Sequence, residues 1–303
     1  MIETDRSTPL DLATVLDRPQ APVAAEQGEN LDIEETIIRP RQGWISIDWG
    51  ELYRGRELLY FLVWRDVKIR YKQTVLGVAW AVLQPLFMMA IFTIVFGRFA
   101  GIPSEGFPYA VFVFAGLLPW TFFANGVSQG GQCLISQQQL LTKIYFPRLF
   151  VPTAAVGAFL VDLLISFGLF AVILVVYRTP PAASIVLLPL PLALTVLATL
   201  GAAYTLSALT VQYRDFRYII PFLVQALMYV SPVIYPLGLL PARYQWVLAI
   251  NPMTGIIEAY RSAILGAPWS WDLLAISTAS TLALFTFGLF YFRKTERRFA
   301  DIA

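Results

Sequence analysis

Six long runs with almost no charged side chains constrain the fold of this chain more than any other feature. Each run has at least 20 residues, and about 20 apolar residues are enough to cross a hydrocarbon core of about 30 Å. A backbone inside lipid must satisfy its own hydrogen bonds, so these runs are expected to be helices. A soluble protein with a large helical core is excluded, because only 14% of the residues are charged, against about 25% in soluble domains. The runs cover residues 73–97, 106–142, 149–177, 179–213, 218–242 and 273–292.

The sequence therefore predicts an all-α integral membrane protein with six transmembrane helices. The membrane domain is expected at 46–292, between an acidic tail at 1–45 and a basic tail at 293–303. The acidic tail is polar and lacks the apolar stretch of a signal peptide, so it is expected to be disordered and cytoplasmic. The predicted spans are about 73–97, 107–131, 149–177, 183–210, 219–240 and 273–292.

The basic residues predict the orientation of the spans. If the chain starts in the cytoplasm and crosses six times, fourteen basic residues near the spans lie inside and four lie outside. This asymmetry follows the positive-inside rule, so both termini are expected in the cytoplasm. The inner set is Arg54, Arg56, Arg65, Lys68, Arg70, Lys72, Lys143, Arg148, Arg214, Arg217, Arg293, Lys294, Arg297 and Arg298, and the outer set is Arg98, Arg178, Arg243 and Arg261.

The composition excludes several kinds of chemistry within this chain. The single cysteine, Cys133, rules out an internal disulfide, and the absence of histidine rules out histidine catalysis and histidine metal ligation. No Gly-Lys pair occurs, so no phosphate-binding loop of the Walker type is present. The chain is therefore expected to be a non-enzyme without cofactor or metal, and any ATP must be hydrolysed by another subunit.

An amphipathic helix is expected before the first span. Asp48 and Glu51 have capping-box spacing, and the apolar stripe that follows includes Leu59 and Val63. Its basic face suits the membrane interface, where long side chains reach the headgroups. The alternatives are a plain juxtamembrane anchor and a platform that touches a cytoplasmic partner. The basic residues that mark this helix are Arg54, Arg56, Arg65, Lys68 and Arg70, with Lys72 at its end.

The loop between the second and third spans carries a second helix signal. Ser136 and Gln139 have capping-box spacing, and 136–145 is long enough for about three helical turns. Pro147 is expected to end that helix. It is either an ordinary loop or a cytoplasmic lever for an ATPase.

Six sequence blocks resemble the type-2 ABC exporter permeases for polysaccharides. They occur in the family's order over about residues 40–292, and the greatest resemblance is to permeases for lipid-linked O-antigen, with capsule and teichoic acid exporters as near relatives. The blocks are WRDVKIRYKQTVLGVAW at 64–80 with Gln84-Pro85, AGLLPWTFF at 115–123, KIYFPR at 143–148, YRDFRY at 213–218, SPVIY at 231–235, and NPMTG at 251–255 continuing through Arg261.

The resemblance implies a homodimer that binds two copies of an ATPase subunit, which would hold ATP and magnesium. It places an interface helix at 51–70 and an ATPase-coupling element at 136–148. It also implies two short helices that fold back into the outer leaflet before the last span, at about 246–250 and 256–265, and a re-entrant gate there. The coupling candidates are Ser136, Leu140, Leu141, Lys143, Tyr145, Phe146 and Arg148, and the gate candidates are Asn251, Pro252, Glu258 and Arg261.

Glu258 and Arg261 are three residues apart, so they are expected to pair on one helical face, either as a gate or as a simple interfacial salt bridge.

Asp162 lies near the middle of the third span, where a charge costs at least about 2.5–3.5 kcal/mol, so it must face protein or water or be protonated. It either joins spans or contacts substrate. Gly126 and Gly130 have the spacing that permits close helix packing.

Aromatic side chains are the candidates for the transport path. A sliding glycan needs wide surfaces without fixed hydrogen bonds, which rings provide. The alternative is that the rings face lipid or neighbouring helices. The second span supplies Phe112, Phe114, Trp120, Phe122 and Phe123, and the fifth supplies Phe222, Tyr229 and Tyr235; with Asp162, the candidates for the path are Trp120, Phe122, Phe123, Tyr229 and Tyr235.

The sequence thus predicts the permease of an ATP-driven exporter of lipid-linked polysaccharide in the bacterial inner membrane. A type-2 ABC permease for small molecules is the first alternative. A membrane-embedded glycosyltransferase or ligase is the second, although the outer side offers few acidic groups beyond Glu105, Glu258 and Asp272. Its expected partners are the ATPase, a second copy of the chain, membrane lipid and the glycan, and no nucleic acid.

Overall fold

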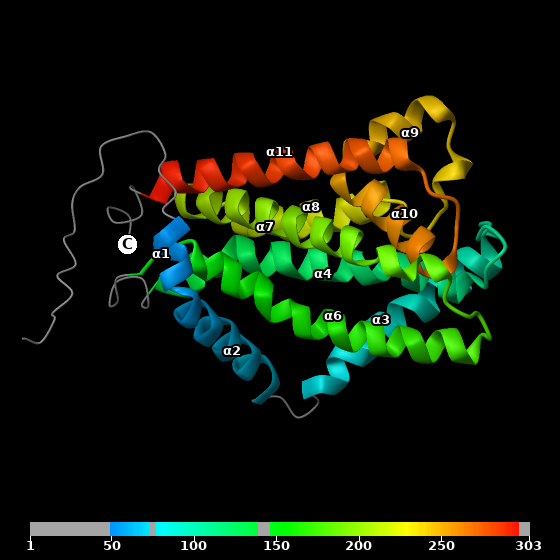
Figure 1. The fold of residues 1–303 in the computed structure, drawn as a ribbon, viewed down its shortest axis with the longest axis horizontal. Coiled ribbons are helices and arrows are strands. Elements are labelled where there is room, and N and C mark those ends of the chain that lie inside the picture. The colour runs from blue at the N-terminus through cyan, green and yellow to red at the C-terminus, as the bar shows by residue number, and fades with distance from the viewer. Residues whose placement is uncertain (1–48, 73–76, 139–145, 297–303) are drawn as a thin grey trace, which may run out of the picture. The chain divides into compact units, whose positions relative to one another are not determined.

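The computed structural model describes residues 49–72, 77–138 and 146–296, and every regular element in these ranges is a helix (Figure 1). The all-helical prediction is confirmed for this part of the chain. The acidic tail at 1–45 and most of the basic tail lie outside the described residues. The elements are α1 (Trp49–Arg54), α2 (Arg56–Lys72), α3 (Gly77–Phe92), the π-helix η2 (Thr93–Phe99), α4 (Tyr109–Ser136), α6 (Phe150–Val176), the 3-10 helix η3 (Ala183–Leu187), α7 (Pro189–Gln212), α8 (Phe216–Val230), the 3-10 helix η4 (Leu237–Leu239), α9 (Ala242–Ala249), α10 (Pro252–Leu265) and α11 (Trp271–Glu296).

Five helical stretches in the described ranges are long and apolar enough to cross a membrane, and α8 is a shorter apolar helix. The long stretches are α3 continued through η2, then α4, α6, α7 and α11. The chain is therefore a multi-pass membrane protein. Five of the six predicted runs appear as continuous helical stretches of spanning length.

The fifth predicted run differs from the others because its helix breaks. α8 has 15 residues, which gives a length of about 22 Å at 1.5 Å per residue and is short of the hydrocarbon thickness. Ser231 has φ −82° and ψ 144°, an extended conformation, because it precedes Pro232 and proline disfavours a helical residue before it. Residues 231–235, called the α8 corner here, follow the helix.

α4 forms the centre of the helix packing and is buried along nearly its whole length. It contacts α3, α6, α7, α8 and α10. A Cβ on Gly126 would lie 2.5 Å from Cγ2 of Thr199 in α7, and a Cβ on Gly130 would lie 2.7 Å from Cβ of Ala203. Any side chain at these two glycines would clash with α7. The close approach predicted from their spacing is therefore confirmed.

α7 and α11 also meet through glycine. A Cβ on Gly288 would lie 2.3 Å from the carbonyl oxygen of Gly201, and a Cβ on Gly201 would lie 2.7 Å from the backbone of Phe285. These contacts leave no room for side chains, so the two backbones touch directly at this crossing.

The amphipathic region before the first span is two helices, α1 and α2, separated at Gly55. α2 packs along α6, with Leu62 and Val67 buried and Leu59 and Val63 partly buried against the core. At Leu59 and Val63, the predicted apolar stripe is thus the face of α2 that packs against the core. The opposite face exposes large apolar side chains such as Tyr60, Phe61 and Trp64. Asp48 lies outside the described residues, and the side chain of Glu51 is not described, so the capping box stays a prediction.

Two short helices precede the last span, as predicted. α9 ends at Ala249 and α10 begins at Pro252, with Asn251 as the N-cap residue. The Asn251 side chain accepts a hydrogen bond from the Met253 amide at 3.1 Å, and Pro252 suits the first helical position because its missing N–H needs no partner there. Figure 1 shows α10 between α11 and α4, both of which it contacts.

Ser136 does not start a new helix. It is the last residue of α4, and its hydroxyl donates to the Cys133 carbonyl one turn earlier at 3.1 Å. The capping-box prediction is therefore wrong for Ser136, because α4 continues past the end expected near 131. Residues 139–145, where most of the expected loop helix would lie, are outside the described residues.

Candidate functional site

The mid-span carboxylate of Asp162 is held by two residues at the end of α2. Arg70 Nη1 donates to Asp162 Oδ2 at 2.6 Å, and the Tyr71 hydroxyl donates to Oδ1. The Arg70 guanidinium also lies over the Phe159 ring, 3.6 Å from its centre. The ion pair is half-buried, with 29% of the Arg70 side chain and 23% of the Asp162 side chain exposed. Charge-assisted bonds of this kind offset the cost of a carboxylate at this depth.

Sequence reasoning left Asp162 without a partner and assigned Arg70 to headgroup contact. The two residues are 92 positions apart in the sequence, so only the fold shows that they are neighbours. Burial raises the pKa of the Tyr71 hydroxyl above its usual range, and the neighbouring Asp162 raises it further. Tyr71 therefore stays protonated and remains a donor.

A small pocket of about 40 Å³, lined by polar and apolar side chains, lies beside Asp162 between α3, α4 and α6. A water molecule needs about 10–15 Å³ of such space, so the pocket has room for a few waters and not for a sugar ring. Its polar lining comes from Gln84, Thr121, Asn125, Asp162 and Ser166. Among the residues that the structure describes, Gln84, Asn125 and Ser166 make no hydrogen bond through their side chains.

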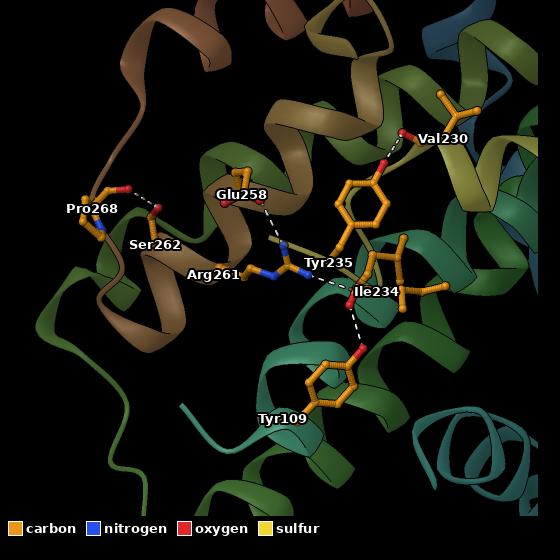
Figure 2. Close-up of polar contacts among 9 residues, drawn as sticks. Tyr109, Val230, Ile234, Tyr235, Glu258, Arg261, Ser262 and Pro268 are labelled. Carbon is orange, nitrogen blue, oxygen red and sulfur yellow. Dashed lines mark hydrogen bonds and ion pairs between the residues drawn. The ribbon is translucent and has the colours of Figure 1, made fainter. Parts of the chain in front are cut away.

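A fully buried arginine joins α10 to the α8 corner (Figure 2). Arg261 Nη1 donates to Glu258 Oε1 at 2.9 Å, which confirms the predicted pairing. Its Nη2 donates to the Val233 carbonyl at 2.9 Å, and the guanidinium lies 3.6 Å from the centre of the Phe112 ring in α4. A Cβ on Gly116 would lie 3.1 Å from Nη2. Arg261 therefore links three parts of the fold, namely α10, the α8 corner and α4.

Two further bonds hold the α8 corner. The Tyr109 hydroxyl, at the start of α4, donates to the Ile234 carbonyl at 2.7 Å, and the Asn251 amide donates to the Ser231 hydroxyl at 2.8 Å. The Tyr235 hydroxyl donates back to the Val230 carbonyl at 3.0 Å, as Figure 2 shows together with the Tyr109 contact. The corner lacks regular secondary structure, and the Arg261 and Tyr109 bonds satisfy its Val233 and Ile234 carbonyls, which a helix would otherwise pair. The gate candidates Asn251 and Arg261 thus contact one segment.

The end of α4 and the start of α6 are tied to other helices. Arg65 of α2 bonds Asp66 at 2.7 Å and the Gln137 side chain, just after α4, at 2.6 Å. Arg148 Nη1 donates to the Glu296 carbonyl at the end of α11, at 2.7 Å. The coupling candidate Phe146 is buried in the cluster of apolar side chains at this end. The remaining coupling candidates Leu140, Leu141, Lys143 and Tyr145 lie outside the described residues.

The predicted path residues do not gather on one surface of this chain. Trp120, Phe122 and Phe123 are buried among the helices around α4, whereas Tyr229 is exposed and Tyr235 is half-buried. The surroundings of the three α4 rings are those expected from the alternative given above, in which the rings pack against neighbouring helices. The role of the set in transport stays a prediction.

The other basic residues of the expected interface helix make local contacts. Arg54 Nε donates to the Gly50 carbonyl at 3.3 Å. The Arg56 guanidinium lies 4.5 Å from the centre of the Tyr53 ring, and the Lys68 amine lies 5.4 Å from that of Trp64. Across the described residues, no three acidic or cysteine side chains gather in a way that could hold a metal ion.

Comparison with known proteins identifies a family whose model matches this chain and several proteins with similar sequences. The model of a family described as ABC-2 type transporter matches residues 57–265. An O-antigen export system permease protein RfbA from Myxococcus xanthus is 32% identical over 238 residues, which cover 77% of this chain and 91% of the relative. A protein of the same name from Klebsiella pneumoniae is 28% identical over 247 residues, 81% of this chain and 95% of the relative. The polysialic acid transport protein KpsM from Escherichia coli is 24% identical over 239 residues, 77% of this chain and 91% of the relative.

Proposed function

Because this chain belongs to the ABC-2 type transporter family as a membrane permease, we propose that it exports a lipid-linked polysaccharide of the O-antigen type across the bacterial inner membrane. As an ABC-2 permease, it works with an ABC ATPase subunit. The observation that carries the proposal is its similarity to O-antigen export permeases along 77 to 81% of its length. The similarity to a polysialic acid transporter is lower and supports the broader class of glycan substrates.

The working assembly in this proposal is a homodimer that binds two ATPase subunits, and the ATPases bind ATP and magnesium. Support for a second copy comes from the outward face of α8, where Tyr218, Phe222 and Tyr229 are exposed. These rings follow one another at steps of four and seven residues, so they share a helical face. Large apolar side chains on such a face need a cover of lipid or protein.

The proposed topology has six crossings with both termini in the cytoplasm, and the fifth crossing is made by α8 together with the α8 corner. The fourteen-to-four distribution of basic residues supports the orientation. In this arrangement α1 and the start of α2 lie at the inner interface and the end of α2 reaches the level of Asp162, while 136–148 couples to the ATPase and α9 and α10 fold into the outer leaflet. The length of α10, 14 residues, is too short for a crossing and supports that placement.

The test is deletion of the gene for this chain in its own bacterium. We expect surface glycan to disappear and lipid-linked glycan to accumulate at the cytoplasmic face, and plasmid-borne wild-type chain to restore export. A matched control is a strain that lacks only the partner ATPase activity, which should give the same accumulation. Unchanged surface glycan in the deletion strain, together with retention of a small apolar compound, would instead favour a small-molecule permease.

A further inference from the structure

The Arg70–Asp162 contact has the chemistry of an occupied anion site. Two donors from α2 converge on one carboxylate, with Arg70 Nη1 2.6 Å from Oδ2 and the Tyr71 hydroxyl on Oδ1. Guanidinium and phenol groups donate in the same way to phosphate oxygens. From this geometry we propose that Arg70 and Tyr71 form a phosphate-binding site, which Asp162 occupies in this structure and from which a phosphate group displaces it.

Arg70 has a contact that does not depend on the carboxylate. The Arg70 guanidinium lies 3.6 Å from the centre of the Phe159 ring, a cation–π contact that does not involve Asp162. Burial keeps the pKa of Tyr71 raised, so its hydroxyl remains a donor through the physiological range. A phosphate that replaced Asp162 would meet a guanidinium that the Phe159 ring still contacts and a protonated phenol.

The site is reachable from the surface of the helices. The two charged side chains retain 29% and 23% of their exposure. Apolar residues on both helices around it, such as Ile69 and Leu164, are exposed, so this surface is the kind that faces lipid. α2 also carries Lys68 near its end, and a basic side chain next to a bilayer attracts anionic headgroups.

A second set of hydrogen-bond donors lies next to Asp162 and can receive its carboxylate when a phosphate displaces it. Asp162 lines the 40 Å³ pocket that also receives Gln84, Asn125 and Ser166. Two amide groups and a hydroxyl without hydrogen bonds among the described residues supply donors there, and water fits between them. The carboxylate therefore has one set of donors on α2 and another on α3, α4 and α6.

The test measures binding to the purified full-length chain in detergent, without ATPase or export. Short-chain phosphatidic acid and inorganic pyrophosphate are titrated separately by calorimetry, with short-chain phosphatidylcholine as the zwitterionic comparison. Asp162→Asn removes the built-in competitor, so phosphate should bind roughly tenfold more tightly. Arg70→Gln should weaken binding roughly tenfold or more, and Tyr71→Phe about fivefold.

Lys72→Gln is the matched control, because it removes one charge from the same helical turn as Arg70; its effect should stay within about twofold in physiological salt. If Asp162→Asn binds phosphate no better than wild type while remaining folded by thermal melting, Asp162 only braces α2 against α6 and the proposal is wrong. If Asp162→Asn does not fold, equal affinities of Arg70→Gln and Lys72→Gln overturn it.

The two probes separate the sources of the phosphate. Tight binding of phosphatidic acid with weak binding of pyrophosphate identifies a lipid headgroup, and comparable binding of both identifies a general phosphate site; binding of neither overturns the proposal. Assignment of the phosphate to the lipid carrier of the glycan rests on the proposed function. The binding constants do not, so the anion site can fail while the export function holds, and the reverse.

Discussion

Replacement of Arg261 by methionine should destabilise the protein more than any other single loss of charge among its described residues. Met keeps an unbranched apolar chain but leaves Glu258 without its partner at 2.9 Å and the Val233 carbonyl without its donor. It also removes the cation from the Phe112 ring. Arg261 is 0% exposed, and breaking a buried ion pair by removing one partner costs about 3–5 kcal/mol.

The assay is the free energy of unfolding of the purified chain in mixed micelles, with abundance in the membrane measured beside it. The double variant Glu258→Leu with Arg261→Met removes both charges, so it should lose less stability than Arg261→Met alone, with a coupling energy of about 1–3 kcal/mol. Arg243→Met is the matched control, because Arg243 is an exposed arginine near the same end of the fold, and it should change stability by about 0.5 kcal/mol or less.

The reasoning would be refuted if Arg261→Met unfolded within about 1 kcal/mol of the wild type. It would equally fail if the double variant were less stable than the single one, because the loss would then come from packing volume and not from the stranded carboxylate.

Three other outcomes are expected. Gly130→Leu should lower membrane abundance, since overpacking costs about 1–3 kcal/mol and its Cβ alone would lie 2.7 Å from Ala203; Gly168→Leu, where no atom lies within 4 Å of the added Cβ, should not. Phe146→Asp places a charge in a buried cluster and should uncouple ATP hydrolysis from export, measured as ATPase rate against surface glycan in variants of equal abundance; full export would contradict the coupling role. In a Cys133→Ser background, a cysteine at 178 should react with an impermeant thiol reagent only from outside, and labelling only from the cytoplasm would overturn the six-crossing topology.

The helices of the described chain follow closely from the sequence because charge-free runs of spanning length leave the backbone one solution in lipid. The exception is α8, and its cause is visible in the chain. Pro232 and Pro236 interrupt the run at 218–242, yet its apolar composition alone reads as one span. Hydropathy reports whether a segment tolerates lipid and does not report where its helix ends.

Whether an ion pair of the candidate site could be predicted from the sequence depends on how far apart its two residues lie in the chain. The Glu258–Arg261 pair was predictable because residues three apart on a helix are neighbours, whereas the Arg70–Asp162 pair depends on how α2 packs along α6, which no local pattern encodes. The rings of α4 show a related limit. Trp120, Phe122 and Phe123 do not share one face of that helix, so periodicity cannot assign the set to a face that lines a path or to a face that packs on α7. Only the arrangement of the surrounding helices shows that Trp120 is buried.

The central position of α4 has a consequence for biogenesis. Its main partner α7 begins at Pro189, whereas α4 ends at Ser136, so at about 5–20 residues per second the ribosome needs several seconds to make the partner. During that interval the glycines that α4 later presents to α7 must wait at the insertion machinery or in bare lipid. The spanning helix that the finished protein covers most completely is thus among the first to leave the ribosome and the one with most reason for escorted insertion.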